Sequence, residues 1–412
     1  MREGWEIKKL GEVCIVERGS SPRPINKYFT DKDDGVNWIK IGDTKDVTKY
    51  LYSTKEKITK EGAKQSRFVK EGDFILSNSM SFGHPFIMKT EGYIHDGWFV
   101  LRLPDYIDVD YFYYLLTSPS IQEQIQGLAS GAIVKNISGD LVKKVELTYP
   151  KSLHKQKHIV SILDETFATI GQAKANTEKN LNNAKELFQS QLNNIFSQKG
   201  EGWVEKKLGE VCQLKPQKKE ARDKLKENDL VTFLPMEDLG VEGKEINPTK
   251  EKTLKEVSGS YTYFADGDVL LAKITPCFEN GKIGIANNLK NGIGFGSSEY
   301  IVFRSNGEVE QELLYYFLSR KSFREEGRAL MTGAVGHKRV SKDWIENYLL
   351  PFPKSIKEQQ KIISQLNTLS TETKKLETIY QQKLNELEAL KKSILQKAFS
   401  GELSEPLINL IK

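Results

Sequence analysis

Two stretches of the chain, residues 151–199 and 354–400, place apolar residues three and four positions apart, with polar residues between them. This spacing puts the apolar side chains on one face of a helix, so each stretch is predicted to form one long helix. Polar residues interrupt both apolar faces, which predicts an imperfect coiled coil. The predicted helix seam comprises Leu163, Phe167, Ile170, Leu181, Phe188, Ile195, Leu366, Leu369, Leu376, Tyr380, Leu387, Leu390 and Ile394.

The stretches before each predicted helix have a different pattern. Residues 1–150 and 200–353 contain short apolar runs, acidic-Gly-Asp turns and aromatic clusters. These features are typical of compact domains that mix α-helices and β-strands. The sequence therefore predicts an α+β protein in which two globular domains are separated by two long helices, with a tail at residues 401–412.

The chain is an internal repeat. "GWEIKKLGEVC" at Gly4 and "GWVEKKLGEVC" at Gly202 share nine of eleven residues, and "EGDFILSNS" is answered by "DGDVLLAKI". "SGAIVKNIS" is similar to "TGAVGHKRVS", and "YPKSLHKQKHIVSIL" is similar to "FPKSIKEQQKIISQL". A period of about 200 residues is far longer than the ~20–50 residues of a solenoid repeat, so a whole domain and its helix are duplicated.

The helix length decides how the repeats are expected to combine. A helix of about 45 residues extends roughly 65 Å, beyond the reach of one globular domain. The two helices can cover each other's apolar stripes, and a two-fold relation between the repeats would make them antiparallel. The tail would then return toward the amino terminus. The alternative is that each helix packs on its own domain.

Composition and charge narrow the function classes. No apolar run approaches the ~18 residues that span a membrane, and the start "MREGWEIKK" lacks the apolar stretch of a signal peptide, so a cytoplasmic protein is expected. Lys plus Arg against Asp plus Glu is 21 to 21 in residues 1–150 and 23 to 24 in residues 201–353. This balance of charges counts against a domain that is basic over its whole surface. Cys14 and Cys212 occupy equivalent places in the repeats, which favours small packed side chains over disulfides or a metal site.

Loop residues supply the candidates for nucleic-acid binding. Lys and Arg can bind phosphates, while Asn, Ser, His and Arg can contact base edges. For any single one of them, an ordinary solvated role is the simpler alternative. The candidate set is Arg23, Lys27, Lys40, Lys45, Ser81, His84, Lys135, Asn136, Lys273, Lys282, His337, Lys338 and Arg339.

Motifs for catalysis are weak. His154 and His158 have metal-ligand spacing but no glutamate between them. "GIGFGSS" lacks the glycine spacing of a nucleotide loop, and the chain has no phosphate-binding G-x-x-x-x-G-K-[ST] motif. Asp266, Asp268 and Glu279, with Lys282, resemble a nuclease carboxylate set only faintly. A site for catalysis or for a metal ion is not expected in this chain.

The duplicated order of these motifs resembles the specificity subunit of type I restriction-modification (R-M) systems over essentially the full length. The resemblance implies a non-catalytic subunit whose two target recognition domains each contact one half of a split DNA site. The helices would fix the gap between the halves, and their outer polar faces would dock two adenine methyltransferase subunits.

The same resemblance implies that cofactors are held elsewhere. S-adenosylmethionine would bind the methyltransferase subunits, and ATP and Mg²⁺ the translocase-nuclease subunits of the full complex. The two halves differ outside the shared motifs, which predicts an asymmetric DNA site. The alternative from another class is a coiled-coil scaffold that binds protein and not DNA.

Overall fold

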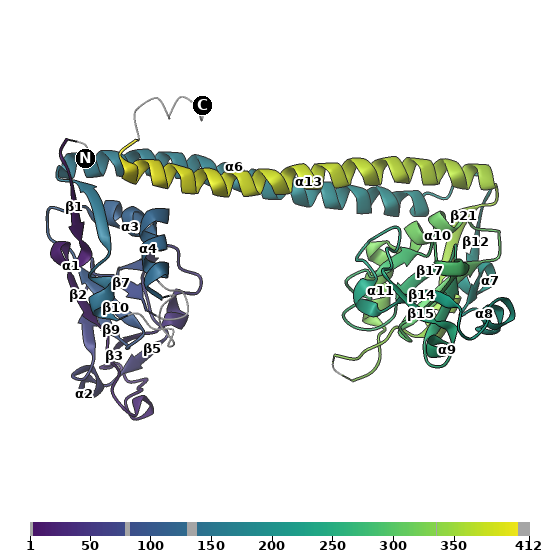
Figure 1. The fold of residues 1–412 in the computed structure, drawn as a ribbon, viewed down its shortest axis with the longest axis horizontal. Coiled ribbons are helices and arrows are strands. Elements are labelled where there is room, and N and C mark those ends of the chain that lie inside the picture. The colour runs from purple at the N-terminus through teal and green to yellow at the C-terminus, as the bar shows by residue number, and fades with distance from the viewer. Residues whose placement is uncertain (1–2, 79–82, 130–137, 335, 403–412) are drawn as a thin grey trace. The chain divides into compact units, whose positions relative to one another are not determined.

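The computed structural model describes residues 3–78, 83–129, 138–334 and 336–402 (Figure 1). The chain divides into two compact units, residues 1–178 with 382–412 and residues 179–381. Each unit therefore contains one globular domain and one half of each long helix, and the two are described separately.

The first domain is built from three sheets. A two-stranded sheet pairs β1 with β11, a five-stranded sheet has the order β2-β10-β7-β8-β4, and a four-stranded sheet has the order β5-β3-β9-β6. The strands are β1 Trp5–Lys9, β2 Ile15–Arg18, β3 Val36–Ile39, β4 Tyr50–Leu51, β5 Glu56–Ile58, β6 Arg67–Val69, β7 Phe74–Ser77, β8 Pro85–Met88, β9 Gly92–Ile94, β10 Trp98–Arg102 and β11 Glu146–Pro150. The helices are α1 Leu10–Val13, α2 Lys60–Ala63, α3 Val109–Thr117, α4 Pro119–Ala129 and α5 Gly139–Val142, with 3-10 turns at Ile25–Lys27 and Ile41–Thr44.

The second domain repeats this order. Its sheets are β12-β21, β13-β20-β17-β18 and β15-β14-β19-β16. The strands are β12 Trp203–Lys207, β13 Cys212–Leu214, β14 Leu230–Leu234, β15 Lys250–Thr253, β16 Thr262–Ala265, β17 Val269–Ala272, β18 Ile283–Ile285, β19 Ile293–Gly296, β20 Tyr300–Ser305 and β21 Leu349–Pro353. The helices are α7 Leu208–Val211, α8 Lys219–Lys224, α9 Leu254–Val257, α10 Gln311–Leu318, α11 Lys321–Ala329 and α12 Lys342–Asn347, with 3-10 turns at Met236–Asp238 and Lys290–Gly292.

The two domains share one fold. Each strand of the second domain has a counterpart in the same position of a sheet of the first, and both four-stranded sheets contain one parallel pair, β3 with β9 and β14 with β19. Within the described residues, strand β4 belongs only to the first domain and helix α8 only to the second. The predicted fold class, two similar mixed domains with two long helices, is confirmed.

The acidic-Gly-Asp motif forms the same turn in both domains. Gly72 and Gly267 have φ of +88° and +89°, a left-handed conformation that a side chain would strain. The carboxylate of the following residue closes the turn: Asp73 accepts a hydrogen bond from the backbone N–H of Lys70, as Asp268 does from that of Ala265. The buried strands β7 and β17 follow directly.

The central sheets are buried on both faces because successive side chains of a strand point in opposite directions. In β10, Phe99 and Leu101 join the core that the long helices cover, while Trp98 and Val100 join the core between the two larger sheets. Strand β20 of the second domain divides its side chains in the same way.

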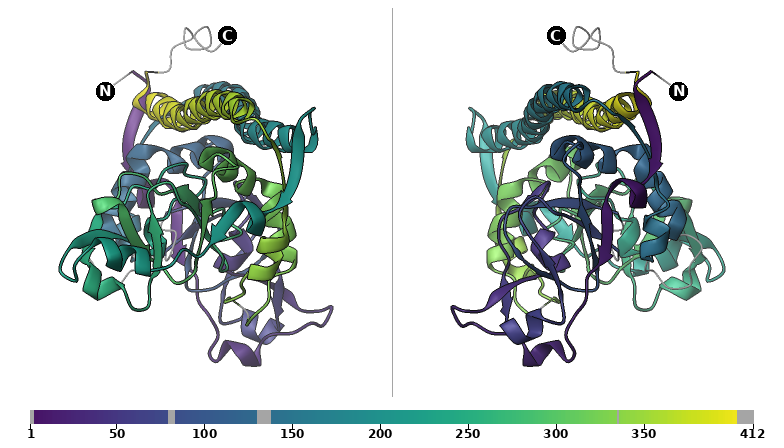
Figure 2. Two further views of the ribbon diagram at one scale, coloured as in Figure 1. Left: turned by 90° about the vertical axis from the view of Figure 1, so that its right-hand side faces the viewer. Right: turned by 90° about the vertical axis from the view of Figure 1, so that its left-hand side faces the viewer.

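The long helices are α6, Leu153–Ser197, and α13, Ile356–Ser400, each of 45 residues. Figures 1 and 2 show them side by side in each unit. In the first unit the amino-terminal half of α6 lies against the carboxyl-terminal half of α13, and Lys174 pairs with Glu388 at 2.6 Å. In the second unit the halves are exchanged, so that the helices pack antiparallel as predicted.

The long helices α6 and α13 pack both on each other and on the globular domains. Ile159 and Leu163 of α6 share the first domain's core with Ile394 and Phe399 of α13. The ring of Phe399 packs edge-on against Tyr111 of α3, with centroids 5.3 Å apart. The carboxyl-terminal end of α13 therefore completes the core of the first domain. Residues 403–412 of the predicted tail lie outside the described residues.

The predicted helix seam is buried to different degrees because each helix faces both its partner helix and a domain. Buried members are Leu163, Ile170, Leu366 and Ile394, and exposed members are Leu376 and Leu390. The partly buried members are Phe167, Leu181, Phe188, Ile195, Leu369, Tyr380 and Leu387. Buried residues outside the predicted seam include Ile159, Leu192, Phe196 and Ile363. No helix of the described ranges has the length and hydropathy needed to cross a membrane.

The cysteines differ in their expected reactivity. Cys14 and Cys212 are buried, and burial raises the pKa of each thiol to about 12, whereas Cys277 is partly exposed. Because the thiolate is the reacting form, we expect iodoacetamide at pH 8 to modify Cys277 and to leave the other two intact until the chain is unfolded. Peptide mass spectrometry before and after denaturation measures this. Modification of Cys14 or Cys212 in the native protein would contradict the packing described above.

Candidate nucleic-acid interface

A basic groove of about 660 Å³ opens in the second domain. Cationic, polar and aromatic side chains line it together, and none of the lining residues is acidic. The cations are Lys215, Lys218, Lys273, Arg339 and Lys342, and the polar and aromatic residues are Gln217, Ser260, Thr262, Ser298, Tyr261, Tyr263 and Tyr300. Such a combination can hold phosphates and present hydrogen-bonding groups to bases.

Two loops that are about 60 residues apart in the sequence build one wall of the groove. The backbone N–H of Thr275 donates to the carbonyl of Lys338 at 2.9 Å, and that of Val340 donates to the carbonyl of Lys273 at 3.0 Å. These bonds bring the predicted residues Lys273, Lys338 and Arg339 together in space. His337 lies in the same loop as Lys338 and Arg339.

A carboxylate fixes the orientation of the cations at this wall. Glu299 accepts two hydrogen bonds from Arg339, at 2.9 and 2.8 Å, and its other near cation, Lys273, is 4.0 Å away. The Lys273 ammonium also donates to the Ser298 carbonyl at 3.0 Å. The hydrogen bonds that Glu299 accepts from Arg339 lower the pKa of the Glu299 carboxyl group. The carboxylate therefore stays ionised and holds the guanidinium in place.

Further positive charge gathers around Lys218, another residue that lines the groove. Burial, together with repulsion from Arg222 and Lys215, lowers the pKa of Lys218. Cations held this close to one another repel, and an anion in the groove would relieve that repulsion. The groove is thus suited to a polyanion.

The corresponding region of the first domain carries different side chains. Asn78 occupies the place of Lys273: its amide donates to the Asp96 carbonyl at 2.8 Å, and its backbone N–H bonds to Gly97 as that of Lys273 bonds to Glu299. The Asp96 carboxylate accepts from Ser21 at 2.8 Å and lies 3.8 Å from the exposed guanidinium of Arg23. The predicted residues Ser81, Lys135 and Asn136 lie outside the described residues.

The side chains of the other predicted residues make contacts of their own. Lys282 donates its ammonium to the carbonyls of Met236 and Glu237, at 2.7 and 3.4 Å, and so holds a loop. His84 packs against the Phe86 ring at 4.8 Å, and burial lowers its pKa. Lys40 pairs with Glu56 at 2.6 Å, while Lys27 and Lys45 are exposed.

Both domains also contain a charge cluster around a buried aspartate that the sequence interpretation missed. Arg304 of β20 donates two hydrogen bonds to Asp268, each 2.7 Å, and a third at 2.5 Å to Glu220. In the first domain, Arg102 bonds Asp73 at 3.3 Å and Glu17 at 2.5 Å. The available signal was the Asp after the shared glycine and an Arg near the end of the matching strand in both repeats.

These contacts assign structural roles to the carboxylates considered for a nuclease. Asp268 is paired with Arg304, Asp266 accepts from the backbone of Leu289, and Glu279 accepts from Thr275. No group of three metal-ligating side chains occurs within the described ranges. The "GIGFGSS" segment forms buried strand β19, where a Cβ on Gly294 would meet the Phe264 ring at 2.1 Å. Gly294 and Gly296 therefore serve sheet packing.

Comparison with known proteins links this architecture to a family. Residues 2–183 and 200–389 match the family model described as "Type I restriction modification DNA specificity domain". The chain is 39% identical over 191 residues to the Type I restriction enzyme EcoEI specificity subunit of Escherichia coli. That alignment covers 46% of this chain and 31% of the E. coli protein, so the match spans about a third of the relative's length.

Two solved structures have the same fold over nearly the whole chain. One comes from a structure of complex assembly and conformational transition of the type I R-M system, with a TM-score of 0.78, 19% identity and coverage of 98% of this chain and 99% of that one. The other is the HsdS subunit from Thermoanaerobacter tengcongensis, with a TM-score of 0.59, 20% identity and 98% coverage of both chains. At such identities the likeness concerns the fold alone.

Proposed function

We propose, because the chain belongs to the family of type I restriction modification DNA specificity domains, that each of its globular domains recognises one half of a bipartite DNA site. The observation that carries this proposal is the groove of the second domain, which five cations and no carboxylate line. Lysines of the groove neutralise backbone phosphates and release counterions. Arg339 and the neighbouring polar side chains contact base edges.

The two half-sites are proposed to differ in sequence. The equivalent positions Lys273 and Asn78 make the same hydrogen bond to the backbone, yet one is a cation and the other an amide. Lysine and arginine favour the acceptors of guanine, whereas the buried amide of Asn78 does not reach a base. Arg23 is our candidate in the first domain, and Lys273, His337, Lys338 and Arg339 are our candidates in the second.

The helix pair is proposed to set the gap between the half-sites and to dock two methyltransferase subunits. Exposed apolar side chains of the second unit, Leu187 of α6 with Leu376 and Ile379 of α13, are 39–47% exposed and offer hydrophobic contacts for a partner. The chain itself would catalyse nothing. S-adenosylmethionine would belong to the methyltransferase subunits, and ATP and Mg²⁺ to restriction subunits of a cytoplasmic complex.

Exchanging the first domain tests the proposal. We expect replacement of residues 1–150 by the equivalent domain of another specificity subunit to change one half of the methylated motif. The other half and the gap should stay the same, because the second domain and both helices are retained. The measurement is co-expression with a type I methyltransferase subunit, followed by mapping of methyladenine in the host genome.

The matched control is co-expression of the methyltransferase subunit without this chain, which should leave the motif unmodified. Methylation that does not depend on the chain would contradict the proposal. A domain exchange that altered neither half of the motif would contradict it as well.

A further inference from the structure

A fully buried glutamine lies in the first turn of each long helix. Gln156 and Gln359 both have 0% exposure. The side-chain oxygen of Gln156 accepts from the backbone N–H of Asp108 at 2.7 Å. Its amide nitrogen donates to the carbonyls of Tyr106 at 3.2 Å and Pro150 at 3.0 Å. One side chain thus connects α6 to the segment before α3 and to the end of β11.

Gln359 makes the equivalent three bonds in the second unit. Its oxygen accepts from the backbone N–H of Glu310 at 2.8 Å, and its nitrogen donates to the carbonyls of Glu308 and Pro353, at 2.8 and 2.9 Å. An amide is required, because only Asn and Gln side chains combine an acceptor oxygen with two N–H donors. We call Gln156 and Gln359 the glutamine anchors.

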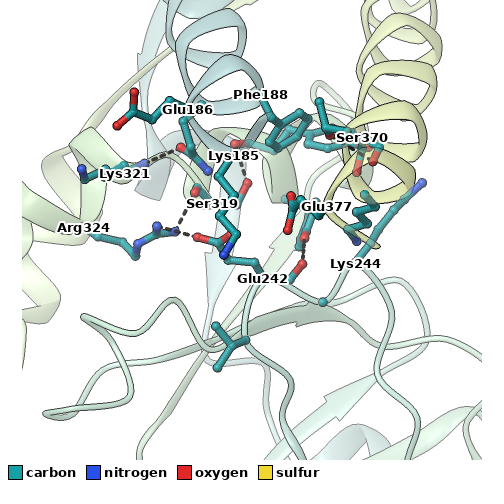
Figure 3. A pocket seen from close by; sticks show the side chains of 17 residues that line it. Lys185, Glu186, Phe188, Glu242, Lys244, Ser319, Lys321, Arg324, Ser370 and Glu377 are labelled. Carbon is teal, nitrogen blue, oxygen red and sulfur yellow. Dashed lines mark hydrogen bonds and ion pairs between the residues drawn. The ribbon is translucent and has the colours of Figure 1, made fainter. Parts of the chain in front are cut away.

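A second connection lies two turns further along each helix. In the second unit, Asn367 of α13 accepts hydrogen bonds from Tyr316 at 2.6 Å and Lys244 at 2.8 Å, and donates to Glu312 at 3.0 Å. A cavity of about 580 Å³ lies beside this network, and Lys244 and Tyr316 are among the residues that line it (Figure 3).

The first unit contains the equivalent connection. Tyr114 of α3 donates to the carboxylate of Asp164 on α6, and its ring carries the ammonium of Lys49 at 5.0 Å from the centroid. Lys49 in turn pairs with Asp110 at 2.7 Å. Both domains are therefore fixed to their own helix at two levels by buried or partly buried polar bonds.

These connections have a mechanical consequence for a bipartite DNA reader. One additional base pair moves a half-site by ~3.4 Å and rotates it by about 35° around the duplex. A helix pair can select one gap only if each domain resists that displacement relative to the helix. Loss of the buried bonds would make the joint compliant and let neighbouring gaps bind.

We propose that the glutamine anchors are positioning residues that restrict recognition to a single gap length. This inference rests on the proposed bipartite recognition. The anchors do not contact DNA. They act by fixing each domain to its long helix, and the helix pair sets the distance between the half-sites. Their contribution is to the discrimination between gaps and not to the affinity for either half-site.

The test compares methylation rates on a set of DNA duplexes whose gap is one base pair shorter than, equal to or one longer than the genomic motif. The purified complex of this chain with its methyltransferase subunits is used. The variant is Gln156→Met with Gln359→Met, which keeps the side-chain volume and removes all six hydrogen bonds. We expect the rate ratio between the cognate gap and its neighbours to fall at least ~10-fold, with a cognate rate within ~3-fold of wild type.

The control variant is Gln172→Met, an exposed residue of α6 whose side-chain amide donates to Asn176 on the same helix. It should leave the ratio unchanged. If the anchor variant does not accumulate, Tyr114→Phe with Tyr316→Phe removes one hydroxyl bond in each unit and is expected to lower the ratio in the same direction.

The outcomes separate the two proposals. A parallel loss of rate at all gaps, with the ratio unchanged, would show that the glutamines serve folding only and would overturn the inference. Wild-type complex that methylates all gaps equally, or none, would overturn the proposed function itself. A lower ratio in the variant with a retained cognate rate supports both.

Discussion

Arg304→Ala is expected to lower the free energy of unfolding of the second domain by about 3–5 kcal/mol, because the substitution leaves a buried charge without its partner. Asp268 is 1% exposed, and Arg304 is the cation that pairs with it, at 2.7 Å. The guanidinium also bonds Glu220 and lies over the Tyr263 ring at 5.6 Å. Urea denaturation followed by tyrosine and tryptophan fluorescence measures the change.

Arg339→Ala is the matched control, since it removes an arginine from an ion pair that is exposed to solvent. The Arg339 side chain is 46% exposed in its ion pair with Glu299, and solvent screens such exposed pairs, so the substitution should change the stability little. An Arg304→Ala protein as stable as this control would show that the buried pair contributes nothing and would contradict the interpretation.

Removing two cations of the groove should weaken DNA binding more than any other surface change. Lys273→Ala with Arg339→Ala deletes two of its five cations. Affinity for the cognate duplex should fall at least about 30-fold, because one contact to a base edge and one to a phosphate are lost. The slope of log affinity against log salt should also become shallower by about 1 for each lost phosphate contact.

Two other paired lysines of the same domain provide the control for this experiment. Lys255 pairs with Glu227 at 3.7 Å and Lys290 with Glu251 at 3.6 Å, and neither lysine lines the groove. Their replacement by alanine should change affinity and salt slope little. Equal losses in both double variants would mean that binding follows the total charge of the domain and not the groove. Fluorescence anisotropy at several salt concentrations separates these results.

The sequence predicted the architecture because the duplicated motifs and the helical periodicity can both be recognised in short segments of the chain. Repeated segments such as "GWEIKKLGEVC" require two domains of one fold, and apolar spacing of three and four indicates helices whatever they contact. The side of a helix that becomes buried is not local. Ile159 and Ile363 lie outside the predicted seam because the domain covers that face, and only the folded chain brings the domain there.

The candidate interface was predictable in kind but not residue by residue. Lys273 and Lys282 lie in one loop and look alike in the sequence, yet only Lys273 lines the groove. The Lys282 ammonium instead donates hydrogen bonds to backbone carbonyls 45 and 46 residues earlier in the chain. The buried pair of Arg304 and Asp268 went unrecognised for the same reason, since its members come together only when β17 and β20 align.

The first domain's dependence on the far end of α13 has a consequence for biosynthesis. Ile394 and Phe399 fill its core, so a nascent chain that has just released residue 150 still displays an uncovered apolar face around Tyr111. At about 5–20 residues per second, ribosomes need roughly 12–50 s to supply the missing side chains. Throughout that interval the emerging protein would depend on chaperones to shield the incomplete core from aggregation.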